Sequence, residues 1–185
     1  MKPFEFAVAA ILGILAIPIV LWSYNHWQTV TGSGTYSNTT SITGSPSISA
    51  SEVDKVLCSN GSPACGTGYT LYTYGSQYSI DPSFALAVFR HESSFGKAGV
   101  ARENLSLGNL RCIQGYACVN GFAAFPSWQA GYSAFYQLIA GPLYVKAGLV
   151  TPEAILAKYA PVADNNDPAG YAADVEASMH NWRSS

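Results

Sequence analysis

Glu92 is an acidic residue that stands among apolar side chains in the segment 81–96, where it could transfer protons. Asp81 followed by Pro82 is typical of a helix start, and Gly96 suits the position just past a helix end. At about 100° per residue, Glu92 falls on the apolar face of this predicted helix. The residues that share that face are Phe84, Ala85, Val88 and Phe95.

Glu92 has the surroundings that a general acid needs. Desolvation penalises a charged carboxylate, so its pKa rises and the proton stays available for transfer. The alternative is a structural glutamate at the edge of the apolar face, hydrogen-bonded to a loop. Ser93 and Ser94 follow at once, and the next thirty residues are rich in Gly, Asn and aromatics. This composition favours a cleft beside Glu92.

Other chemistries find little support in this chain. A zinc protease helix would need a second histidine at the position of Phe95, and His180 is the only other histidine of the predicted domain. Ser93 and Ser94 lack a G-x-S-x-G elbow. We therefore expect neither a metal nor a cofactor. Glycosidic cleavage remains, because it needs a protonated carboxylic acid and a group that stabilises an oxocarbenium-like centre.

Composition and charge limit the classes of partner that the chain could bind and the cellular compartment in which it could fold. With nine Lys and Arg and a net charge of −2, the chain has no electrostatic footprint for nucleic acid. Abundant Tyr, Trp, Ser, Thr and Asn suit hydroxyl-rich ligands such as sugars, although interface-forming proteins share this bias. The cysteines lack metal-finger spacing and allow three disulfide pairings, with free thiols as the alternative. Local pairing, Cys58–Cys65 with Cys112–Cys118, is favoured and implies an oxidising compartment.

The N-terminal 27 residues predict a membrane anchor. Phe6–Trp22 is a run of 17 residues without a charged side chain, just long enough to span a bilayer. A cleaved signal peptide is the alternative, but the run is long for one and no A-x-A-like site follows. Trp22, Tyr24 and Trp27 suit an interfacial aromatic belt. Lys2 favours a cytoplasmic N-terminus, or the interior of a virion, with the domain on the cell-wall side.

The remaining chain divides into a tether and one domain. Residues 28–50 carry no charge and are rich in Thr, Ser and Gly, which predicts a flexible tether. Residues 51–185 form the predicted domain, with Ser51 capping its first helix. Further helices are predicted over 68–78, after Asp81, after Ser127, after Thr151 and after Asp167. The segment 97–125 is an irregular or β-hairpin excursion, so the fold class is mainly α.

Four segments in order resemble the peptidoglycan-cleaving lysozyme-like superfamily, with endo-β-N-acetylglucosaminidases of glycoside hydrolase family 73 as the nearest match and lytic transglycosylases as relatives. The resemblance covers roughly residues 80–182 and implies a lysozyme-like α+β fold. The segments are His91–Gly96 (HESSFG), Ala101–Leu110 (ARENLSLGNL), Phe125–Tyr132 (FPSWQAGY) and Thr151–Pro161 (TPEAILAKYAP), the last followed by Asp164–Asn166 and Tyr171.

The resemblance implies that Glu92 is the catalytic acid. It also implies that Gly108 and Asn109 line the sugar cleft and that Tyr159 approaches Glu92 or the substrate, although Tyr159 equally suits a core position. Ser93 and Phe125 are further candidates for substrate binding. Glu103 is the nearest second acid in sequence, a solvated loop glutamate being its alternative, and Asp164 is another acid to consider. In a lytic transglycosylase Glu92 would act alone.

These observations lead to two hypotheses from different classes. The leading one is a membrane-anchored peptidoglycan hydrolase that cleaves the β-1,4 glycan strand, as an N-acetylglucosaminidase, muramidase or lytic transglycosylase. Its expected partners are glycan strands, the bilayer around residues 6–22, and envelope or virion assembly partners of a bacterium or phage. The competing hypothesis is a non-catalytic wall-binding or structural subunit that keeps a lysozyme-like shape.

Overall fold

The computed structural model describes residues 40–184. The predicted anchor at Phe6–Trp22 lies outside the described residues, as does the first part of the predicted tether. Among the helices of the described residues, none is long and apolar enough to cross a membrane.

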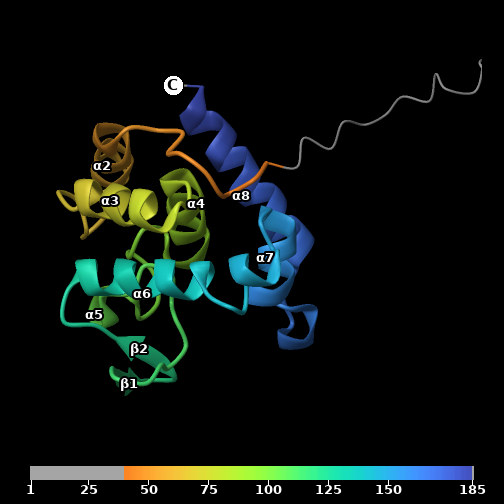
Figure 1. The fold of residues 1–185 in the computed structure, drawn as a ribbon. Coiled ribbons are helices and arrows are strands. Elements are labelled where there is room, and N and C mark those ends of the chain that lie inside the picture. Colours follow the sequence, from red (N-terminus) through yellow and green to blue (C-terminus); the bar gives the residue numbers. More distant parts are fainter. Residues whose placement is uncertain (1–39, 185) are drawn as a thin grey trace, which may run out of the picture. The chain divides into compact units, whose positions relative to one another are not determined.

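The described chain is mainly helical and carries one small antiparallel sheet (Figure 1). This confirms the predicted fold class of the domain. The helices are α2 (Ala50–Ser59), α3 (Gly68–Tyr78), α4 (Pro82–Ser93), α5 (Ala101–Asn104), α6 (Trp128–Ala140), α7 (Pro152–Tyr159) and α8 (Pro168–Arg183). Strands β1 (Ala117–Val119) and β2 (Phe122–Ala124) precede α6, and the short 3-10 helices η1 (Val145–Ala147) and η2 (Val162–Asp164) flank α7.

Local capping explains where most of the helices begin. A side-chain oxygen at each cap accepts a backbone N–H of the first turn, which satisfies one of the donors that a helix start leaves free. Proline occupies the first turn of α4, α7 and α8, where its missing N–H costs nothing. The predicted starts are confirmed at Asp81, Ser127, Thr151 and Asp167.

Helix α4 lies at the centre of the core. Every residue from Pro82 to Phe89 is buried, and Figure 1 shows α4 among α3, α6 and α8. Its closest packing is against α8, while Phe89 meets Phe135 of α6 edge to face, with ring centroids 4.8 Å apart. The first two turns of α4 are therefore enclosed on all sides, whereas Arg90 and His91 in its last turn are exposed. Glu92 lies in that last turn, directly after the buried part of the helix.

Helix α4 ends sooner than the sequence predicts, since the sequence placed Gly96 just past the helix end. Its last helical residue is Ser93, and the left-handed cap is Ser94, with φ of 48°. Phe95 continues in the left-handed region with φ of 59°. The unusual turn is held by the Ser93 hydroxyl, which accepts from the Gly96 N–H at 2.9 Å and donates to the Leu107 carbonyl at 2.8 Å.

The predicted tether, residues 28–50, extends into a segment that the structure packs against the domain. Within residues 40–49, the side chains of Ile42 and Ile48 are buried in the core, with 0% and 7% exposure. The Ile42 N–H donates to the Val150 carbonyl, and the Asp81 N–H donates to the Ile42 carbonyl, both at 2.8 Å. Burial of the two isoleucines and these backbone hydrogen bonds together attach a segment of polar composition to the core.

The cap of the first described helix also differs from the prediction. The hydroxyl of Ser49, not Ser51, accepts the N–H of Glu52 at 3.1 Å, and α2 begins at Ala50. The next helix, α3, is capped from a distance. Its own N-cap Thr67 makes no side-chain cap bond, but Asp54 of α2 accepts the N–H groups of Gly66 and Gly68, each at 2.9 Å.

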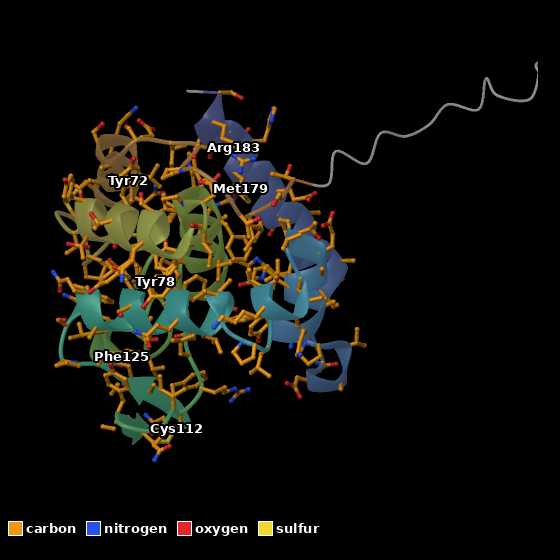
Figure 2. All side chains as sticks on the ribbon, in the orientation of Figure 1. Tyr72, Tyr78, Cys112, Phe125, Met179 and Arg183 are labelled. Atoms are coloured by element: carbon orange, nitrogen blue, oxygen red, sulfur yellow. A yellow bond between two sulfur atoms is a disulfide. The ribbon has the colours of Figure 1, made fainter. Side chains whose placement is uncertain are left out.

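The two ends of the described domain are joined by a buried charge. Arg183, at the end of α8 in Figure 2, donates to Asp81 Oδ2 at 2.6 Å and to the Ser47 hydroxyl at 2.8 Å. Asp81 also accepts from Ser83 and is 4% exposed. Segment 40–49, the start of α4 and the C-terminal helix are thereby fixed to one another.

The excursion contains the predicted hairpin. Strands β1 and β2 pair in register Ala117 with Ala124, and Asn120 and Gly121 form the turn with φ of 54° and 82°. Two positive φ angles are what a two-residue type I′ turn requires. The local disulfides Cys58–Cys65 and Cys112–Cys118 are both formed, as predicted. Figure 2 shows Cys112 beside the hairpin.

Candidate active-site cleft

The Glu92 side chain lines a cleft with a volume of about 380 Å³. One wall comes from the loop after α5 together with β2, and the other from the end of α7 and the segment after it. The residues that line the cleft besides Glu92 are Asn109, Leu110, Arg111, Phe122, Tyr144, Lys158, Tyr159, Ala160, Pro161, Asp164 and Asn166. Both walls therefore belong to segments that meet only in the folded chain.

The Glu92 carboxyl group is half-buried and holds its proton more tightly than a free glutamate. Burial raises the pKa of Glu92, and this outweighs the hydrogen bond from Tyr171 and the opposing influence of His91, Asn109 and Arg111. A carboxyl group with a raised pKa is protonated over a wider pH range, as general acid catalysis requires.

Tyr171, on the first turns of α8, holds the Glu92 carboxyl group from behind. Its hydroxyl donates to Glu92 Oε1 at 2.8 Å. Burial, followed by the nearby Glu92 charge, raises the pKa of Tyr171 well above its usual value, so the hydroxyl remains a donor. The His91 ring stacks on the Tyr171 ring at 3.7 Å, and His91 Nδ1 lies 3.3 Å from Asp174 Oδ2. These contacts fix the tyrosine's orientation.

The predicted sugar-binding pair Gly108-Asn109 lies beside Glu92. Asn109 lines the cleft, and its Nδ2 donates to the Glu92 backbone carbonyl at 2.9 Å. A Cβ at Gly108 would lie 3.1 Å from Phe135 and 3.2 Å from Phe89, so glycine lets the loop cross the core closely. The Tyr159 hydroxyl donates to the Gly108 carbonyl at 2.7 Å. Tyr159 thus ties α7 to the opposite wall of the cleft.

Other predicted site residues lie away from the cleft lining. The Ser93 side chain is buried, and its hydroxyl is occupied by Phe89, Leu107 and Gly96. Phe125 is buried against Tyr116, with ring centroids 4.7 Å apart. Glu103 is exposed on α5 and is not among the cleft residues. The acid that lines the cleft with Glu92 is Asp164.

Sequence reasoning assigned no role to several residues that the fold brings to the site. Tyr171 stands at the end of the segments that carry the resemblance, but it lies 79 residues from Glu92 in the chain and was given no role. Arg111 had no signal beyond its charge, and Lys158, although inside the segment Thr151–Pro161, was given no role. Within residues 40–184, no three His, Cys, Asp or Glu side chains are grouped closely enough to hold a metal ion.

The sequence and the structure were compared with those of known proteins. No family model and no curated protein matches the sequence. Among solved structures, the chain is similar to S. aureus autolysin E in complex with the muropeptide NAM-L-Ala-D-iGlu, with a TM-score of 0.56 and 12% identity. The match covers 78% of this chain and 70% of that chain. The described domain therefore has the fold of that autolysin.

Proposed function

We propose that this protein is a peptidoglycan glycosidase in which Glu92 is the general acid. The observation that carries the proposal is the position of the Glu92 carboxyl group, half-buried at the floor of the cleft and hydrogen-bonded to Tyr171. Support also comes from the autolysin E fold, since that neighbour was captured with a muropeptide.

The chemical step follows from the protonation state of Glu92. Its proton passes to the oxygen of the glycosidic bond as the bond between that oxygen and the anomeric carbon breaks. The anomeric carbon becomes electron-poor, and the released sugar leaves as an alcohol. Glu92 is then a carboxylate next to the oxocarbenium-like centre, where the Tyr171 hydroxyl stabilises its negative charge.

The second step needs a nucleophile and a base, and two acids are candidates. We favour Asp164 over Glu103, because Asp164 lines the same cleft as Glu92 whereas Glu103 lies outside the cleft lining. In an inverting or retaining hydrolysis, Asp164 would accept a proton from water or attack the anomeric carbon. In a transglycosylase, the sugar's own 6-hydroxyl attacks and Glu92 takes its proton, so neither acid is required.

Mass spectrometry of fragments released from purified cell walls tests the proposal and identifies the reaction. A reducing N-acetylglucosamine end, a reducing N-acetylmuramic acid end and an anhydro end each mark a different bond or mechanism. Asp164→Asn, with Glu103→Gln as its matched control, tests the second group. Release of none of these fragments, with retention of the protein on insoluble wall, would favour the non-catalytic alternative.

The proposed site of action is outside the cytoplasm. The two disulfides support this, since such bonds persist in oxidising compartments. We further propose that Phe6–Trp22 anchors the chain in a membrane, with the domain facing the wall of a bacterium or carried by a phage. Membrane fractionation of the full chain, compared with a chain lacking residues 1–27, measures this directly.

A further inference from the structure

Two cations line the cleft without a salt bridge to neutralise them. Arg111 follows the Asn109 loop and pairs through its backbone with Phe122 of β2. Lys158 lies in the last turn of α7, on the opposite wall. The three ion pairs found among residues 40–184 include neither side chain. Most Lys and Arg side chains of the described residues lack an ion pair, but these two are distinguished by lying in the lining of the cleft beside a candidate general acid.

Each cation is held against an aromatic ring of the cleft wall. The Arg111 guanidinium lies 5.2 Å from the centroid of the Phe122 ring. Lys158 Nζ lies 5.9 Å from the centroid of the Tyr144 ring. Cation–π contacts of this length restrain a side chain that would otherwise sample many rotamers. The two charges are thus carried by separate parts of the cleft lining, Arg111 by the segment between α5 and β1 and Lys158 by α7.

The charge balance of the cleft makes it attractive to anions. Its charged lining consists of Glu92, Arg111, Lys158 and Asp164. When Glu92 carries the proton that it must donate, two positive charges face one negative charge. The whole chain has a net charge of −2, so the positive cleft is a local feature and not a consequence of overall composition.

We propose that Arg111 and Lys158 bind carboxylate groups carried by the glycan strand, so that the cleft selects peptide-substituted, anionic glycan over neutral glycan. This proposal rests on the proposed function and adds the substrate class to it. Arginine offers a planar fork that matches a carboxylate, and lysine offers a compact point charge. Cations on both walls would fix the strand along the cleft and so set which glycosidic oxygen reaches Glu92.

The test measures binding without turnover, in the Glu92→Gln background, by calorimetry. The two probes are a soluble disaccharide peptide with free carboxylates and the same molecule after amidation of those carboxylates. Tighter binding of the free acid is expected. Adding Arg111→Gln or Lys158→Gln should weaken binding of the free acid about tenfold and leave the amidated probe unchanged. Lys146→Gln, on the exposed η1 outside the cleft lining, is the matched control.

Three results would overturn the inference, and they differ in what they say of the proposed function. Equal affinity for both probes, or equal losses on both probes in the arginine and lysine variants, would remove carboxylate recognition. If wild-type protein still clears purified walls in that case, the glycosidase function stands alone. If neither probe binds and wild-type protein clears no walls, both proposals fail together.

Discussion

The Tyr171 hydroxyl donates a hydrogen bond of 2.8 Å to Oε1 of Glu92, and the two residues come from α8 and α4, which pack extensively against each other. The bond joins the buried central helix to the C-terminal helix at the point where the chemistry is proposed. Because the phenol favours the charged form of the carboxyl group, it moderates the effect of burial on the pKa of Glu92.

Tyr171→Phe should shift the pH dependence of activity. Removing the donor destabilises the Glu92 carboxylate, so the pKa of Glu92 rises further. A general acid works while protonated, and the alkaline limb of the pH profile should therefore move to higher pH. The measurement is initial clearing rate against pH. Tyr159→Phe is the control, because its hydroxyl donates to the Gly108 carbonyl instead; an equal shift in both variants would contradict the account.

Glu92→Gln should make the protein more stable at high pH. The folded-state pKa of Glu92 is raised above its unfolded value, so protonation favours the folded state. That stabilisation is complete below the unfolded pKa and is lost as pH rises through the folded pKa. Glutamine cannot ionise, so the variant should have a higher Tm at pH 8 and an equal Tm at pH 3. The exposed Glu103→Gln variant controls for the loss of one charge.

Arg183→Gln should destabilise the domain by about 2 kcal/mol at neutral pH, because it leaves the buried Asp81 carboxylate without its charged partner. Burial alone would raise the pKa of Asp81, but hydrogen bonds from Ser47, Ser83 and Arg183 outweigh it and lower the pKa. The stabilisation is thus present above the unfolded pKa and lost as pH falls through the folded pKa.

Urea unfolding at pH 7 and pH 3 measures this effect. The difference between wild type and Arg183→Gln should shrink at the lower pH. Lys55→Gln is the control, since the Lys55–Glu52 pair is a surface pair with a lysine side chain 70% exposed. Such pairs contribute about 0.5 kcal/mol or less. Similar losses in both variants would show that burial of Asp81 is not decisive.

The two disulfides should have separable effects. Replacing Cys58 and Cys65 with serine removes a constraint of about 2 kcal/mol by the loop-closure estimate, in a segment packed on the core, and should lower the Tm. Replacing Cys112 and Cys118 loosens the exposed hairpin that carries Phe122 and adjoins Arg111. That variant should lose activity severalfold with little change in Tm, because the hairpin can open locally.

The sequence predicts those parts of the fold whose stabilising contacts lie close together in the chain. Caps such as Ser127 and Asp167 lie within three residues of the N–H groups that they satisfy, so helix starts could be read directly. The hairpin turn also had a local signal in Asn120-Gly121, which would have located both strands. The burial of Ile42 and Ile48 depends on distant partners, and the sequence around them is polar.

The candidate site was predictable in part for the same reason. Glu92 was identified from its place on an apolar helix face. Asn109 was identified because its segment resembles that of a known superfamily. Tyr171 reaches Glu92 because α8 packs on α4, and although Tyr171 belongs to the resemblance, no role followed for it from the sequence. Asp164 and Lys158 depend equally on where the end of α7 lies. Pattern reasoning selects Glu92 as the candidate acid, but tertiary packing selects the groups that face it.

The most direct test of the central claim is the clearing of purified cell walls by Glu92→Gln, followed by turbidity. A general acid contributes about 10²- to 10⁴-fold to the rate, so the variant should clear walls slower by that factor while remaining folded. Glu103→Gln, exposed on α5, is the matched comparison. Clearing by Glu92→Gln at the wild-type rate would contradict the assignment of Glu92 as the acid.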